Sequence, residues 1–158
     1  MSNYPTCFDR AVWISPSSKV ASPIIKKCFY IEKPACDAKI YITGVGYFEA
    51  RLNGVLLTED KLIPPVSDYL RRDYSKNTYP VRDYFTHRIY YHTFPIQDKL
   101  VSGENILEVW LGGGWFVQEE RNAEGDMSYS DNCVCIFAIS SGDDLILSDG
   151  TESWTESI

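Results

Sequence analysis

Apolar and polar residues alternate with a period of two along much of this chain, which is the pattern of β-strands. In the clearest case, 105–111, the residues divide into two alternating sets: Ile106, Glu108 and Trp110 against Leu107, Val109 and Leu111. The segment 88–94 (RIYYHTF) also reads as a strand. Between these two strands lies Gly103-Glu104-Asn105, which we interpret as the turn of a β-hairpin.

The remaining pattern predicts several more short strands and no convincing amphipathic helix. A second hairpin is expected at Asn53-Gly54, because both residues tolerate positive φ. Gly44-Val45-Gly46 is interpreted as a link between two strands. The expected further strands cover 24–33, 38–43, 47–52, 55–57, 133–140 and 144–148. Eight or so short strands separated by turn signals predict an all-β fold with one antiparallel β-sandwich domain over residues 1–158.

Two long polar segments interrupt the strand pattern. Residues 59–87 are rich in proline, charge and tyrosine, and residues 117–132 (VQEERNAEGDMSYSDN) form a second, mostly polar segment. Segments of this length inside a compact domain are usually binding loops or insertions.

Three consecutive glycines, 112–114, follow the strand 105–111 and precede Trp115. Glycines weaken a strand interior, but they allow torsions closed to other residues and let another surface approach the backbone. The run lacks the Lys-Ser/Thr ending of a phosphate-binding loop, and no helix is expected after it. We therefore expect Trp115 to be presented at the sandwich edge toward a sugar or a neighbouring domain. The alternative is that Trp115 packs in the core or against another domain.

Composition narrows the class of ligand and the cellular setting. The net charge is −7, which argues against nucleic acid and suits a neutral polyol or a protein partner. No apolar run approaches the roughly 20 residues of a membrane span, and the first residues lack the pattern of a signal peptide. The five cysteines lack a disulfide rhythm. We interpret them as reduced thiols in a cytoplasmic protein, with Cys133 and Cys135 as small buried residues on one side of a strand.

Catalytic chemistry is poorly represented in the sequence. Glycoside hydrolysis commonly requires two carboxylates about 5–9.5 Å apart. The candidates for such a pair lie in one polar loop that we interpret as a solvated face: Glu119, Glu120, Glu124 and Asp126. The histidines are His87 and His92, and His92 fits a strand position better than a general base. No serine has the surroundings of a nucleophile elbow.

Carbohydrate binding is the more promising chemistry, since a pyranose combines one apolar face with a polar rim. Aromatic and polar residues with suitable chemistry fall on loops or strand ends: Asn53, Asp68, Tyr69, Arg71, Tyr74, Trp115 and Phe116. Asp131 and Asn132 are weak candidates for calcium ligands, although such a pair more often begins a strand after a turn. No cofactor is expected otherwise.

In its order of motifs the chain resembles the N-terminal domain of bacterial α-L-rhamnosidases, glycoside hydrolases that release terminal rhamnose. The matching motifs are 11–14 (AVWI), 38–44 (AKIYITG), Gly46-Tyr47, 52–54 (LNG), 64–69 (PPVSDY) followed by Arg71 and Arg72, 91–94 (YHTF), 103–105 (GEN), 112–116 (GGGWF) and 149–154 (DGTESW). Residues 73–87 look like an insertion relative to the family, Pro95-Ile96-Gln97 departs from its usual sequence, and Phe116 stands where tyrosine is commoner.

The resemblance implies a jelly-roll sandwich of the galactose-binding-domain type, without the helical barrel that carries catalysis in such enzymes. On this interpretation the chain is a non-catalytic module whose partners are the catalytic domain and, in some relatives, rhamnose bound through calcium. The alternatives are an independent lectin-like module that binds rhamnose and a self-sufficient glycosidase. Function by fold analogy is an expectation that the site itself has to support.

Overall fold

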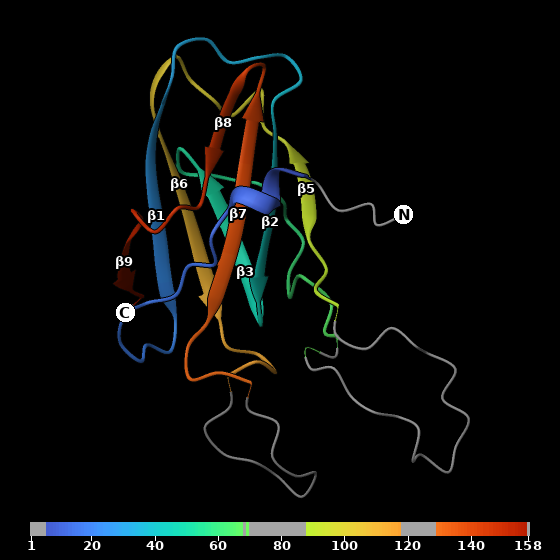
Figure 1. Ribbon diagram of the computed structural model, residues 1–158, viewed down its shortest axis with the longest axis vertical. Coiled ribbons are helices and arrows are strands. Elements are labelled where there is room, and N and C mark those ends of the chain that lie inside the picture. Colours follow the sequence, from blue (N-terminus) through green and yellow to red (C-terminus); the bar gives the residue numbers. More distant parts are fainter. Residues whose placement is uncertain (1–5, 68, 70–87, 118–128, 158) are drawn as a thin grey trace, which may run out of the picture.

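The computed structural model describes residues 6–67, 69, 88–117 and 129–157 (Figure 1). Within these residues the chain forms one short 3₁₀ helix, η1, and nine β-strands. Their bounds are η1 Thr6–Arg10, β1 Pro23–Ile31, β2 Lys39–Val45, β3 Tyr47–Leu52, β4 Val55–Leu56, β5 His92–Pro95, β6 Gly103–Gly112, β7 Val134–Ser141, β8 Asp144–Leu147 and β9 Ser153–Glu156. No helix in this part of the chain has both the length and the hydropathy needed to span a bilayer.

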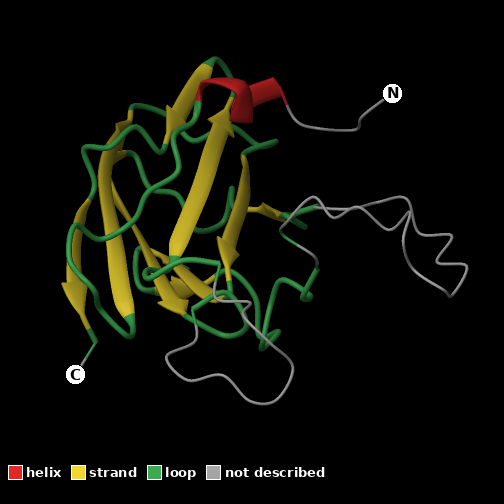
Figure 2. Ribbon diagram, turned by 60° about the horizontal axis from the view of Figure 1, so that its bottom comes forward, coloured by secondary structure: helices red, strands yellow, loops and turns green. Residues whose placement is uncertain are grey.

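The strands form two antiparallel sheets that pack face to face (Figures 1 and 2). One sheet has the strand order β4-β3-β6-β1-β9 and the other has the order β5-β2-β7-β8. The prediction of an all-β, antiparallel, jelly-roll-like sandwich is confirmed. The helix η1 lies against β7 and β8, on the outer side of the four-stranded sheet.

The core lies between the two sheets and follows the period of two. In β6, Leu107 and Val109 are completely buried, while Ile106 and Trp110 on the opposite face are partly exposed. The inward residues of β2 and β7 join the same hydrophobic cluster, as do those of β1 and β3: Ile40, Ile42, Phe137, Ile139, Ile25, Ile31, Ala50 and Leu52. The alternation predicted for 105–111 is therefore confirmed, with each set of side chains on its own face.

Most of the predicted strands and the Asn53-Gly54 turn are confirmed. Asn53 and Gly54 have φ values of 52° and 80°, as a two-residue hairpin of the mirror-image type requires. Gly44 and Val45, interpreted as a link, belong instead to β2, because both pair with β7. The strand β9 was not predicted from the sequence, since its four residues alternate too briefly to give a signal.

The predicted hairpin around Gly103-Glu104-Asn105 is wrong. These residues are the first part of β6, and β5 and β6 lie in different sheets. The connection 96–102 crosses from one sheet to the other, and its buried Ile96 and Leu100 close the end of the core. β5 and β6 follow one another in sequence but are joined by an arch from one sheet to the other. The arch places Ile96 and Leu100 in the core between the sheets.

Asn105 holds this arch in place through its fully buried side chain. Its amide nitrogen donates to the carbonyls of Val101 (2.8 Å) and Gly103 (3.0 Å). Its oxygen accepts from the Val101 amide (2.9 Å) and from the Asn53 side chain (2.8 Å). Asn105 therefore connects the arch to the Asn53-Gly54 turn, and it leaves none of its usual polar capacity unused.

Replacing Asn105 with leucine should lower the free energy of unfolding by about 2–4 kcal/mol, because several buried polar groups lose their partners at once. Urea denaturation followed by circular dichroism measures this change. Glu104→Ala, at the exposed neighbouring position, is the matched control and should have little effect. A loss below about 0.5 kcal/mol in Asn105→Leu, the level of an ordinary surface substitution, would contradict the role given to Asn105.

Candidate functional site

The predicted sugar-binding residues around Trp115 lie at the end of the sandwich where β2 turns into β3 and β6 ends (Figure 1, lower end). There Tyr47, the first residue of β3, pairs with Gly112, the last residue of β6. Val45, the last residue of β2, pairs with Val134 at the start of β7. We call this region the loop end. Both long polar segments of the sequence connect to it.

Glycine is required at the loop end because two backbone segments meet there. Gly46 has a φ of 102°, and a Cβ atom on it would lie 2.3 Å from the carbonyl oxygen of Gly112. A Cβ atom on Gly114, whose φ is 49°, would lie 2.8 Å from the ring of Tyr47. The close approach expected at the glycine run is thus made by the chain's own backbone and by Tyr47.

Three aromatic rings, those of Tyr69, Phe116 and Tyr129, form a cluster at the loop end. The Phe116 and Tyr129 rings stack with centroids 6.0 Å apart, and Tyr69 meets both edge-on at 5.5 and 5.2 Å. Burial raises the pKa of the Tyr69 hydroxyl. The Tyr129 amide also donates to the Phe116 carbonyl (3.2 Å), which brings together the two ends of the polar segment between them.

Trp115 adjoins this aromatic cluster in sequence and is 55% exposed. The backbone turn 113–117 fixes its position, since the amides of Phe116 and Val117 both donate to the Gly113 carbonyl (2.9 and 3.1 Å). The exposed Trp115 side chain does not pack in the core, so that alternative is wrong. An exposed indole on a rigid turn can stack on a sugar ring or bury itself against another domain.

Of the other predicted sugar-binding residues, the structure describes Asn53, which lies away from Trp115. Asn53 lies at the opposite end of β3, where its side chain donates to Lys99 and Asn105 and accepts from the Ile106 amide. This is a structural role within the hairpin. Three predicted residues lie outside the described residues: Asp68, Arg71 and Tyr74.

The calcium candidates Asp131 and Asn132 are brought together with no other carboxylates in the described part of the chain. Asp131 is exposed, and the Asn132 amide group lies among the backbone carbonyls of Pro16, Ser18 and Asp131. Among the described residues, no group of three or more His, Cys, Asp or Glu side chains is placed to hold a metal ion.

The residues weighed for catalysis divide between the described and undescribed parts of the chain. His92 lies in β5, where its ring stacks on Phe94 and meets Phe48 edge-on. Burial lowers the pKa of His92, and its Nε2 atom makes no hydrogen bond in the described part of the chain. This is the strand position predicted for it. The remaining candidates lie outside the described residues: His87, Glu119, Glu120, Glu124 and Asp126.

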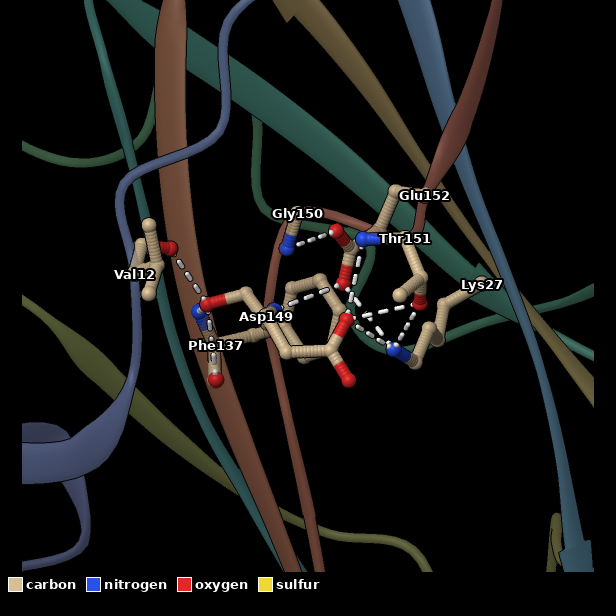
Figure 3. Close-up of polar contacts among 8 residues, drawn as sticks. Val12, Lys27, Phe137, Asp149, Gly150, Thr151 and Glu152 are labelled. Atoms are coloured by element: carbon tan, nitrogen blue, oxygen red, sulfur yellow. Dashed lines mark hydrogen bonds and ion pairs between the residues drawn. The ribbon is translucent and has the colours of Figure 1, made fainter.

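A charged cluster around Lys27, not predicted from the sequence, joins β1 to the segment before β9 (Figure 3). The nearly buried Lys27 ammonium donates to Asp149 (2.6 Å) and Thr151 (2.8 Å) and lies 3.3 Å from Glu152. The Glu152 side chain is completely buried and accepts from the amides of Asp149 and Gly150. Because Glu152 is enclosed, Asp149 and Glu152 act as a structural clasp and not as a catalytic pair.

Ser148 extends this clasp to the N-terminal segment. Its buried hydroxyl donates to the Val12 carbonyl (2.7 Å), and it accepts from the Phe137 amide (3.2 Å). The Val12 amide in turn donates to the Ser148 carbonyl (2.8 Å). These bonds explain why the family-like motifs at 11–14 and 149–154, far apart in sequence, belong to one structural unit.

The five cysteines, all within the described residues, form no disulfide in the structure. Cys133 and Cys135 are buried side by side on the inward face, and burial raises the pKa of both thiols. They are therefore packing residues, unsuited to nucleophilic or metal chemistry.

Comparison with known sequences identifies the family. The sequence model of the alpha-L-rhamnosidase N-terminal domain matches residues 33–154. This chain belongs to that family. A curated relative, an alpha-L-rhamnosidase of Formosa agariphila, is 29% identical over 128 residues, which cover 78% of this chain and 11% of the relative. The chain thus spans only a small part of that relative's length.

Solved structures share the fold. The alpha-L-rhamnosidase of Aspergillus terreus superposes with a TM-score of 0.64 at 23% identity, covering 98% of this chain and 16% of the other. That of Streptomyces avermitilis, complexed with L-rhamnose, gives a TM-score of 0.67 at 21% identity, covering 86% and 12%. At these identities the likeness establishes the fold and leaves function to the site.

The clasp makes stability depend on pH in the acid range. The hydrogen bond from Lys27, followed by that from Thr151, lowers the pKa of Asp149 to about 2. A lowered pKa means that this contribution to stability is present above about pH 4 and is lost as the pH falls toward 2. Asp149→Asn should cost about 1 kcal/mol at pH 7, because the carboxylate is half exposed and solvent screens the pair.

Urea denaturation of wild type and Asp149→Asn between pH 7 and pH 2 tests this dependence. The difference between the two chains should shrink toward zero below pH 4. Asp143→Asn, which removes an exposed charge from the β7–β8 turn, is the matched control for net charge. A difference that stays constant down to pH 2 would refute the assignment to the clasp.

Proposed function

We propose that this chain is a non-catalytic N-terminal module of an α-L-rhamnosidase that packs on the catalytic domain and contributes to carbohydrate binding. One observation carries the proposal. The chain folds around its own core, yet it corresponds to only 11% of the curated relative and 12–16% of the solved structures above. A self-contained sandwich of this kind within a much longer enzyme is an accessory domain.

The loop end is the part of the module that we propose for contact with carbohydrate or with the catalytic domain. Trp115 stands exposed on a turn whose backbone is fixed by Gly113 and Gly114. Large rigid aromatic side chains bury much area for little loss of conformational freedom. Tyr69, Phe116 and Tyr129 support the turn from the side and are themselves only partly accessible.

A second candidate function is an independent lectin-like module that binds rhamnose without the remainder of the enzyme. The exposure of Trp115 favours it, because an indole that is free in the isolated chain can stack on a sugar there. The two candidates differ in one measurable property, which is sugar affinity of the 158-residue chain by itself.

Calorimetric titration of the chain with L-rhamnose, with and without calcium, separates the candidates. The lectin-like module should release heat, and Trp115→Ala should weaken binding about tenfold, a loss of about 1.4 kcal/mol. Trp13→Ala is the matched control, since Trp13 is also an exposed tryptophan but lies in the N-terminal segment. Absence of heat from a folded chain favours the docking module.

Incubation of the same chain with an aryl rhamnoside tests the non-catalytic assignment. No turnover is expected. Turnover that a carboxylate substitution within this chain abolishes would overturn the assignment and favour a self-sufficient glycosidase.

A further inference from the structure

The outer face of the five-stranded sheet carries an open groove of about 320 Å³. Its floor is formed by the start of β3 and the end of β6. Its walls come from the segment 60–62 and from residues near the start of β1 and the end of β9. Neither Trp115 nor Phe116 lines it. The groove is therefore distinct from the exposed turn at the loop end.

The groove exists because Gly112 places no side chain on the outer face. Side chains alternate along β6, so position 112 points the same way as Trp110. Its pairing partner is Tyr47, which also lines the groove. Ser22 and Ser157 line it as well.

Packing does not require glycine at position 112, whereas positions 113 and 114 do require it. A Cβ atom there would meet nothing closer than the Cβ atom of Tyr47, at 3.9 Å. A Cβ atom on Gly113 would lie 3.0 Å from the Val117 carbonyl oxygen, and Gly114 has a positive φ. Glycine also weakens a strand interior. In the structure, the absence of a side chain at Gly112 leaves the groove open.

The ring of Trp110 forms one part of the groove, and Arg51, which lies outside the groove, packs against this ring. Trp110 is 37% exposed, and the Arg51 guanidinium lies over its ring at 5.5 Å from the centroid. Arg51 does not itself line the groove. Leu62, which is 70% exposed, and Pro23 add apolar surface.

Charged groups beside Trp110 form the polar part of the groove, and ion pairs fix their orientation. Glu49 on β3 is the direct pairing partner of Trp110. The Glu49 carboxylate accepts from Lys61 (2.8 Å) and from Arg51 (2.9 Å). The hydrogen bonds from Lys61 and then Arg51 lower the pKa of Glu49, so it remains ionised at neutral pH. Hydroxyl groups of a ligand can donate to such a carboxylate and accept from the ammonium group.

We propose that this groove binds one neutral pyranose ring, with its apolar face toward Trp110 and its hydroxyls toward Glu49 and Lys61. Its volume is near the lower limit of small-molecule pockets, roughly 300–1,000 Å³, which suits a single ring. The charged lining residues Glu49, Asp60 and Lys61 nearly balance, and Arg51 stands just behind them. With a net charge of −7 on the chain, this balance favours a neutral sugar over an anionic one. The site rests on the proposed contribution to carbohydrate binding and deepens it, but it does not depend on Trp115.

Ligand-observed NMR saturation transfer tests the proposal, with methyl α-L-rhamnopyranoside and methyl β-D-glucopyranoside as neutral probes and D-galacturonate as the anionic probe. All measurements use the Trp115→Ala chain, so that sugar bound at the Trp115 turn does not contribute. At least one neutral probe should receive saturation, and galacturonate should receive much less.

Gly112→Val fills the groove and is the decisive variant. It should abolish the saturation signal, while the melting temperature stays the same or rises, since valine suits a strand better than glycine. Trp110→Ala should weaken the signal at least fivefold. Ile106→Phe is the matched control, because it adds bulk on the same face of β6 outside the groove.

Two outcomes would overturn the groove proposal: no saturation of either neutral probe in the folded Trp115→Ala chain, or an unchanged signal in folded Gly112→Val. The second outcome would assign the sugar to another surface. Neither outcome affects the docking role or the Trp115 titration, so the two proposals fail separately.

Discussion

The packing of the inward face of β6 against the opposite sheet is the constraint on which the rest of the structure depends. β6 is the middle strand of its sheet, and Leu107 and Val109 are completely buried there. Because strand side chains alternate, this burial decides which residues of β6 face outward. A shift by one residue would expose the core set and bury Trp110. The groove at Gly112 and the exposed Trp110 therefore follow from the same register that builds the core.

Once the core is formed, buried polar groups hold one end and one edge of the sandwich, and glycines allow the other end to close. Asn105 fixes the arch at one end, and Gly46 with Gly114 allows the backbone to close the other. At the edge, Lys27 and Glu152 hold the segment that leads to β9. Each of these buried polar groups is satisfied, so they specify geometry without an unpaired charge in the interior.

The motifs that carry the family resemblance turn out to be largely structural. The Asn53-Gly54 turn forms a hairpin, the Gly103–Asn105 segment holds the arch through Asn105, and the Asp149–Trp154 segment carries the clasp. Membership of the family therefore identifies the fold, and the relatives that share this fold are longer α-L-rhamnosidases. Within the described residues, the surfaces that we propose for binding are the exposed Trp115 turn and the groove at Gly112.

The sequence by itself determined the all-β class, the faces of β6, the Asn53-Gly54 hairpin and the buried cysteine pair, because these depend on local alternation and turn chemistry. It could not determine that β5 and β6 belong to different sheets, that Asn53 contacts Asn105, or that Lys27 meets Asp149 and Glu152. Those facts depend on contacts between residues far apart in the chain, and alternation is the same whether neighbouring strands form a hairpin or an arch. Tertiary structure decided between the two, since only the folded core requires Ile96 and Leu100 to be inside it.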